Sequence, residues 1–174
     1  MQTTTKIKSL DNASSQEKLL IHKAIVLQQE IINTLNFRMK FESTKFKQND
    51  GLSSLQIYNK VMSGFSNLTK YEDFCLDYSI EVFLGKKGTL AATNMNTFKI
   101  FLNKLSFQHW LNNKNGVAYC AGSLFHEYLH TMGFTHSYLP LGTKRKSVPY
   151  LGGAIMRDLI KFKLGGGVLT PLKN

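Results

Sequence analysis

The chain has few cysteines and few prolines: its 174 residues include two cysteines, Cys75 and Cys120, three prolines and one tryptophan. Two cysteines cannot supply the dense disulfide network of small secreted domains, so a hydrophobic core has to stabilise the fold. The pair could form one disulfide in an oxidising compartment or remain two thiols, and the sequence leaves both possibilities open. The two residues lack the spacing and the neighbouring ligands of a cysteine-based metal site.

Long apolar runs are also missing. No stretch approaches the 18 or so uninterrupted apolar residues of a membrane-spanning helix, so we expect no membrane span. The N-terminal segment MQTTTKIKSLDNASSQEK contains no apolar signal core, so the chain either is already mature or is not exported by that route. A length of 174 residues with 43% apolar residues predicts one globular domain over residues 1–174, with flexible ends at 1–11 and 165–174.

Acidic residues are scarce relative to basic ones. The sequence holds 11 Asp and Glu residues against 22 Lys and Arg residues, which gives a formal net charge of +11. Such a charge favours attraction to acidic substrates, nucleic acid or an anionic cell envelope, although an ordinary lysine-rich, solvated surface gives the same composition. The basic residues are scattered, with one run at residues 144–146, and no nucleic-acid-binding motif accompanies them. We therefore do not expect nucleic acid as the partner.

The sequence does contain a group of histidines at fixed spacing, in the stretch HEYLHTMGFTH. His126 and His130 are four residues apart, so on a helix their rings project from one face and both can reach one cation. Glu127 lies about 100° further round the helix, where it can reach a water on that cation rather than the cation itself. Gly133 falls where the helix should end, and because glycine adopts positive φ without strain, the chain can turn and return His136 as a third ligand. Three neutral nitrogens with one open position are typical of a catalytic zinc site.

The pattern HExxHxxGxxH resembles the signature of the metzincin clan of zinc endopeptidases, and all five of its defined positions match. The resemblance implies a small α/β (α+β) catalytic domain with a twisted, mostly parallel sheet, an active-site helix and a C-terminal helix. It also implies a secreted or cell-envelope location, Zn²⁺ as the metal, and a methionine-containing turn (the Met-turn) beneath the zinc.

The Met-turn and an oxyanion-stabilising tyrosine are the parts of the resemblance that match least well. Met156, twenty residues after His136, is the candidate for the Met-turn, and an ordinary core methionine is the alternative. Several metzincins carry a tyrosine two residues after that methionine, poised to contact the substrate oxyanion, whereas Asp158 stands there in this chain. Tyr150, or else Tyr138, is the candidate that could take this role.

Hydrophobic periodicity predicts a mixed α/β chain. We expect helices over residues 14–35, 53–63 and 155–163 and an active-site helix from Val117, strands over residues 36–46, 75–84, 89–93 and 97–102, and a loop at the end of residues 106–116. Strand 36–46, helix 53–63 and strand 75–84 would form a parallel unit with a right-handed crossover. By resemblance to metzincin-like folds, residues near 89–95 would form an edge strand that binds an extended substrate by strand addition.

Three functional hypotheses fit these features. The first is a zinc endopeptidase, a hydrolase in which zinc on His126, His130 and His136 activates water and Glu127 acts as general base on a peptide or protein substrate. The second is a zinc-binding structural or interaction module without hydrolysis, for which Glu127 would be unnecessary. The third is a zinc amidase that acts on bacterial cell-wall peptide, whose polyanionic surroundings suit the positive charge. We favour a monomeric zinc endopeptidase, while the substrate, the cleavage preference, the activation mechanism and the compartment stay open.

Overall fold

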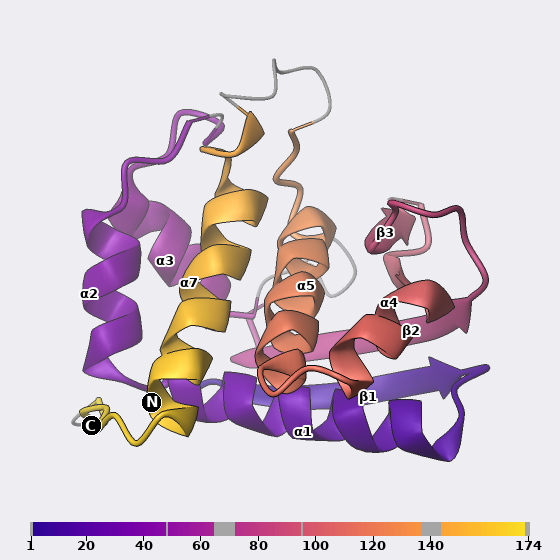
Figure 1. Ribbon diagram of the computed structural model, residues 1–174. Helices are drawn as coiled ribbons and strands as arrows, with labels where there is room; N and C mark the ends of the chain where they lie inside the picture. The colour runs from indigo at the N-terminus through magenta and orange to yellow at the C-terminus, as the bar shows by residue number, and fades with distance from the viewer. Residues whose placement is uncertain (1, 48, 65–71, 95, 137–143, 173–174) are drawn as a thin grey trace.

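The computed structural model describes residues 2–47, 49–64, 72–94, 96–136 and 144–172 (Figure 1). Within these ranges the chain forms six helices and one four-stranded mixed sheet, which confirms the predicted α+β fold class. The elements in chain order are β1 (Thr4–Asp11), α1 (Ser15–Ile32), α2 (Leu35–Ser43), α3 (Ser54–Met62), β2 (Cys75–Phe83), β3 (Ala91–Asn94), β4 (Lys99–Asn103), α4 (Lys104–Leu111), α5 (Gly116–Thr131) and α7 (Val148–Leu164).

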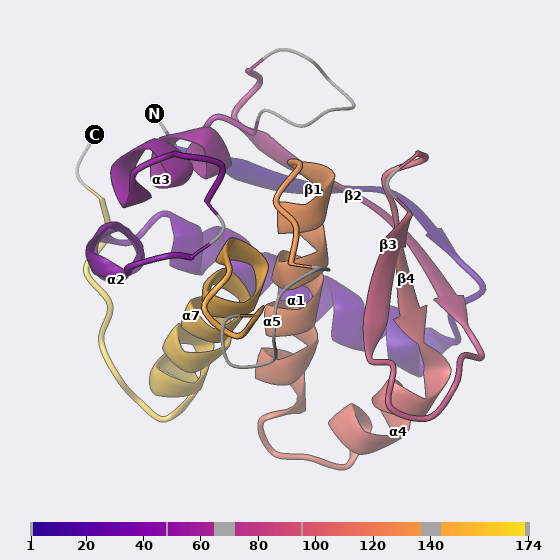
Figure 2. The same cartoon turned by 90° about the horizontal axis from the view of Figure 1, so that it is seen from above.

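The sheet has the strand order β1-β2-β4-β3. β1 pairs with β2 and β2 pairs with β4 in parallel, whereas β3 runs antiparallel to β4 and forms one edge of the sheet. Along β2 the side chains alternate between buried and partly exposed, so one face of the sheet is covered and the other is more open. In both views of the ribbon, α5 stands between α7 and the strands β3 and β4 (Figures 1 and 2).

A buried polar contact joins the covered face of the sheet to two helices. Gln28 of α1 is fully buried; its side-chain amide donates to the carbonyl oxygen of Ala121 in α5 at 2.7 Å and accepts a hydrogen bond from the hydroxyl of Tyr78 in β2. The ring of Tyr78 also packs 5.1 Å, centroid to centroid, from that of Tyr128 in α5. Because both helices contact the same strand residue, α1 and α5 cover the same face of the sheet.

Both ends of the described chain are tied to the C-terminal end of α1, and the prediction of a flexible segment at 1–11 is wrong for residues 4–11, which form a strand. Residues 4–11 form β1, and Thr3 and Asn33 exchange two hydrogen bonds, of 3.0 and 2.8 Å. The backbone N–H of Leu172 donates to the carbonyl oxygen of Asn33 at 2.9 Å. Both ends pair mainly through backbone groups, which a hydrophobicity pattern does not report. Figures 1 and 2 show the two termini close together.

The predicted strand 36–46 is instead the helix α2, and this correction changes the topology. Thr34 begins the helix, because its side-chain hydroxyl accepts a hydrogen bond from the N–H of Phe37. Phe37 and Phe41 are four residues apart, so they share one helical face and are both fully buried, whereas Met39 is 61% exposed. The alternation that indicated a strand therefore also fits a short helix with one apolar face. β2 pairs in parallel with β1 and β4, not with residues 36–46.

The other predicted elements divide into confirmed and corrected ones. The structure confirms the helix at 53–63 as α3, the strand at 75–84 as β2, the two short strands as β3 and β4, and the helix predicted from Val117 as α5. Helix 14–35 ends at Ile32, with Asn33 as its C-terminal cap. Residues 104–111 form the helix α4, which was not predicted; the segment 106–116 was expected only to end in a loop. The side chain of Asn103 caps α4 by accepting a hydrogen bond from the N–H of Leu105.

The two cysteines are free thiols. Cys75 is partly exposed at the start of β2 and contacts the Asp77 carboxylate at 3.4 Å, whereas Cys120 is fully buried in α5, where burial raises the pKa of its thiol. In the part of the chain that the structure describes, none of the helices has the length and apolar character needed to cross a membrane.

Candidate metal centre

Three histidine side chains converge at the C-terminal half of α5. His126 and His130 project from one face of the helix, and His136 approaches from the segment that follows it. The Nε2 atom of His136 lies 3.2 Å from Nε2 of His126 and 3.0 Å from Nε2 of His130. The structure therefore brings together the three residues that the sequence predicts as metal ligands.

The return of the third histidine depends on how α5 ends. The helix stops at Thr131, and Gly133 adopts φ of +98°, a left-handed conformation that favours glycine. The backbone N–H of Phe134 then donates to the carbonyl oxygen of Leu129 at 3.2 Å, and the Phe134 ring is fully buried. This turn and its buried anchor place His136 two residues further on, as the glycine at this position predicts.

Backbone carbonyl groups orient two of the rings. Nδ1 of His130 lies 2.7 Å from the carbonyl oxygen of Phe134, and the backbone carbonyl of Pro149 in α7 lies near His126, where it favours a proton on that ring. An imidazole that donates from Nδ1 presents an unprotonated Nε2, which is the form that ligates a metal. The contact with Pro149 also means that α7 helps to hold the first ligand.

Burial keeps the imidazoles neutral. Desolvation, with the neighbouring histidines, lowers the pKa of His126 to about 3, and desolvation lowers the pKa of His130 to about 4. The pKa of His136 is also lowered, first by desolvation and then by the positive charge of Lys144. Neutral rings near pH 7 have lone pairs available for a cation.

The geometry fits a metal ion better than it fits hydrogen bonding among the rings. Nε2 of His136 contacts two other Nε2 atoms but can carry one hydrogen at most, so it cannot satisfy both neighbours. A tetrahedral ion with metal–nitrogen bonds of about 2.0–2.1 Å would separate its ligand nitrogens by about 3.3 Å. The observed separations of 3.2 and 3.0 Å are close to that value. The three histidines thus form a group that could hold a metal ion.

Glu127 lies beside this group, and an edge-strand residue holds its carboxylate. Oε1 of Glu127 is 3.9 Å from Nε2 of His126, too long for a hydrogen bond. The hydroxyl of Thr93 in β3 donates to Oε2 at 2.7 Å and also lies 3.1 Å from the carbonyl oxygen of Glu127. Burial raises the pKa of Glu127 to about 7, and the hydrogen bond from Thr93 opposes that rise. Sequence reasoning missed Thr93, since nothing in its neighbourhood shows that its side of β3 faces α5.

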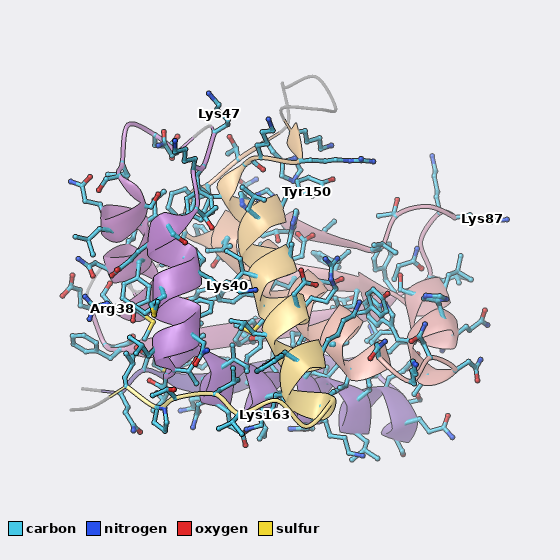
Figure 3. All side chains as sticks on the ribbon, turned by 60° about the vertical axis from the view of Figure 1, so that its left-hand side comes forward. Arg38, Lys40, Lys47, Lys87, Tyr150 and Lys163 are labelled. Carbon is cyan, nitrogen blue, oxygen red and sulfur yellow. The ribbon has the colours of Figure 1, made fainter. Side chains whose placement is uncertain are left out.

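Tyr150, the predicted oxyanion stabiliser, lies next to the histidines. It is in the first turn of α7, with its ring centroid 4.7 Å from that of His126 and 4.8 Å from that of His136. Figure 3 shows it at the N-terminal end of α7. The alternative residue, Tyr138, lies outside the described residues.

Met156 is not in a turn, so the prediction of a Met-turn at this residue is wrong. The predicted helix 155–163 begins seven residues earlier, at Val148, and Met156 is a fully buried residue in the middle of α7. The alternative of an ordinary core methionine agrees with this position. Ser147 begins the helix and Pro149 stands in its first turn, a start signal that the prediction did not use.

An open cleft of about 620 Å³ runs past the histidines. One wall is formed by residues 88–93, which include the first part of the edge strand β3. The others are formed mainly by α5 and by the N-terminal half of α7. Glu127 and all three histidines line it, so the candidate metal position is reachable from outside. The two other histidines, His22 in α1 and His109 in α4, are not part of the group.

In comparisons with protein-family models, with curated proteins and with solved structures, nothing matched this chain.

Proposed function

We propose that this chain is a zinc-dependent endopeptidase related to the metzincin clan. The observation that carries the proposal is the convergence of three imidazole nitrogens beside a buried glutamate in an open cleft. A purely structural zinc site normally has four protein ligands, whereas three ligands and an open side are typical of catalysis.

Zinc is the metal that this donor set favours. Three imidazoles at tetrahedral spacing, with no thiolate and no ligating carboxylate, resemble the catalytic zinc sites built on histidine. Zinc bound by His126, His130 and His136 would supply a Lewis acid that polarises a carbonyl and makes water a nucleophile near neutral pH.

Glu127 is the proposed general base. Its carboxylate takes a proton from the attacking water and passes it to the leaving amine as the peptide bond breaks. A base works best when its pKa lies near the working pH, and burial raises the pKa of Glu127 to about 7. The Thr93 hydroxyl occupies Oε2 and leaves Oε1, the oxygen near His126, for this proton transfer.

The edge strand and Tyr150 are the proposed substrate contacts. β3 forms an edge of the sheet and its residues line the cleft, so an extended peptide can add to it through backbone hydrogen bonds. Tyr150 stands beside the ligands, where its hydroxyl can donate to the oxyanion that develops on the substrate carbonyl. Both roles remain predictions.

Two experiments together test the proposal. Metal analysis of the purified chain should find one zinc per chain, and a mixed peptide library should be cleaved in a chelator-sensitive way. Glu127→Gln should retain zinc and lose cleavage by at least about a hundredfold, because it removes the base but keeps the shape. His130→Ala should lose both zinc and cleavage.

The alternatives give different results in the same assays. Bound zinc with no cleavage of any peptide, by either wild type or variant, would favour a zinc-binding interaction module. Release of stem peptide from cell-wall fragments, without cleavage of ordinary peptides, would favour an amidase. Cleavage that survives in Glu127→Gln would show that another group is the base.

A further inference from the structure

The cleft beside the three histidines carries more positive than negative charge. Among the described residues that line it, Glu127 is the one carboxylate, whereas Lys144 and Arg157 are cationic. Glu127 already accepts a hydrogen bond from Thr93 and is the proposed base. A substrate side chain that enters the cleft therefore meets positive charge that the cleft itself does not balance.

The two cations differ in how available they are. Nε of Arg157 lies 2.9 Å from the carboxylate of Asp158, the next residue of α7, so most of its charge is compensated. No carboxylate of the described segments lies within ion-pair distance of Lys144. Its ammonium group lies 5.9 Å from the centroid of the Tyr150 ring instead. Lys144 is therefore the cation free to bind an incoming anion.

Lys144 also lies close to the reacting centre. The Tyr150 ring that it approaches packs at 4.7 and 4.8 Å against two of the histidine rings, His126 and His136. The charge of Lys144 contributes to the lowered pKa of each of the three histidines. Through these two contacts the Lys144 ammonium lies at most about 11 Å from the His126 and His136 rings, so a group bound to it would sit within about three residues of the bond that would be cut, given the roughly 3.3–3.6 Å length of an extended residue.

Further basic residues surround Lys144. The backbone N–H of Lys47 donates to the carbonyl oxygen of Lys146 at 2.8 Å, which joins the segment after α2 to the basic run at 144–146. Lys47, Arg145 and Lys146 are exposed. Figure 3 shows Lys47 and Tyr150 at the same end of the molecule. These charges attract an anion toward the cleft, and Lys144 lies where it would be bound.

We infer that Lys144 is a specificity-determining residue that selects substrates with a carboxylate within about three residues of the scissile bond, an inference that rests on the proposed peptidase function. The carboxylate has two possible sources, an Asp or Glu side chain or the free C-terminus of a short peptide. Both present the same anion to the same ammonium group, and the peptide ends distinguish them.

The test uses matched synthetic peptides and the full-length protein loaded with zinc. One set carries Glu or Gln at each position around a constant cleavable bond, with both ends blocked. A second set carries Gln throughout and ends in either a free or an amidated C-terminus. We expect wild type to cleave the preferred carboxylate peptide with a kcat/KM about three- to tenfold higher than its neutral partner, as for a partly screened charge pair. The ratio should shrink as salt rises from about 0.02 M to about 0.5 M.

The variants assign the preference to one side chain. Lys144→Ala should bring the ratio close to one, Lys144→Glu should invert it in favour of the neutral Gln peptide, and Lys144→Arg should keep it. Lys23→Glu is the matched control, because it makes the same change in net charge at an exposed residue of α1. Helix α1 lies at the N-terminal end of α5, whereas Gly133 and the histidines lie at the other end (Figure 1). Lys23→Glu should leave the ratio unchanged.

Each outcome separates this inference from the proposed function. Cleavage with equal kcat/KM for Glu and Gln peptides, and for free and amidated ends, would overturn the role of Lys144 while leaving the peptidase intact. A preference that survives in Lys144→Glu, or that falls equally in Lys23→Glu, would also overturn it. Absence of cleavage for every peptide would reject the proposed function itself.

Discussion

One hydroxyl group fixes the orientation of the Glu127 carboxylate. The Thr93 hydroxyl donates to Oε2 of Glu127 at 2.7 Å and lies 3.1 Å from the backbone carbonyl oxygen of Glu127. It therefore contacts both the side chain and the backbone of Glu127. Thr93 belongs to the edge strand on which substrate is proposed to add. A peptide bound to β3 and the carboxylate of Glu127 would therefore be positioned by the same strand, which sets the distance between them.

We predict that Thr93→Val lowers kcat by about tenfold with little change in KM, because loss of an outer hydrogen bond to a site residue typically costs 10–100-fold. Valine keeps the shape and the strand propensity of threonine but cannot donate. Thr93→Ser keeps the hydroxyl and should restore most of the activity. The measurement is steady-state cleavage with zinc content determined in parallel. If Thr93→Ser is as impaired as Thr93→Val, the hydroxyl does not position the base.

The candidate metal ligands were predictable at the residue scale, and Thr93 was not. His126, His130 and His136 follow from helical spacing and from one glycine, so local geometry within eleven residues decides where their rings point. Thr93 reaches Glu127 across 34 positions of sequence. Its contact depends on how β3 lies against α5, and no local pattern encodes that arrangement.

At the scale of elements, the contact between α5 and α7 holds the ligands in place. The two helices approach so closely that a Cβ atom at Gly153 would lie 2.7 Å from the carbonyl oxygen of Gly122 and 3.1 Å from Cβ of His126. The same helix carries Pro149, whose carbonyl lies near His126, and Tyr150, whose ring packs on two histidines. Separation of α7 from α5 would therefore disturb the site as well as the core.

We predict that Gly153→Ala destabilises the fold by about 1–3 kcal/mol, since the added methyl group meets backbone that cannot move without shifting a helix. It should also weaken zinc binding. Gly152→Ala is the matched control in the same helix, because its methyl group meets side chains and no backbone: the end of Leu129 closely, and the rings of Phe125 and Phe41 at an ordinary 3.5 Å. Chemical denaturation and zinc titration of both variants check this. Equal losses in the two variants would show that the close helix contact has no special role.

The elements that were predicted correctly are those whose apolar pattern has one interpretation. β2 alternates over nine residues, and α5 carries the metal motif, so each has a clear period. The nine residues of α2 fit a strand and a helix almost equally well, and packing of Phe37 and Phe41 in the core decides for the helix. β1 has a partly exposed pattern and gains its place through parallel pairing with β2, a contact between residues about 70 positions apart.

At the scale of the whole molecule, the proposed metal site and the stability of the fold should depend on each other. The three imidazoles are brought together by α5, by the turn that follows it and by the first turn of α7, so they converge only in the folded chain. A metal that binds the folded state and not the unfolded one stabilises the fold by mass action. Zinc should therefore raise the unfolding midpoint, and a chelator should lower it.

The metal-free protein should lose stability on acidification, and the pKa values give the sign. Unfolded histidine has a pKa of 6.5, whereas His126 and His130 have values of about 3 and about 4 in the folded chain. Between roughly pH 4 and 6.5 the unfolded state therefore binds more protons, so stability rises with pH across this window. Glu127 acts in the opposite direction, since its pKa rises from 4.5 to about 7 on folding, but it contributes one proton against two or more.

We expect the unfolding free energy of the chelator-treated protein to be clearly lower at about pH 5 than at about pH 6.5, by up to about 1.4 kcal/mol per pH unit for each net proton. His130→Asn removes one of the titrating rings and should flatten the dependence. Glu127→Gln removes the opposing group and should steepen it. Denaturant titrations at both pH values decide between these outcomes. If the metal-free protein is as stable at about pH 5 as at about pH 6.5, the imidazole rings are solvated and protonated. They then do not form the buried, neutral group on which a metal site depends.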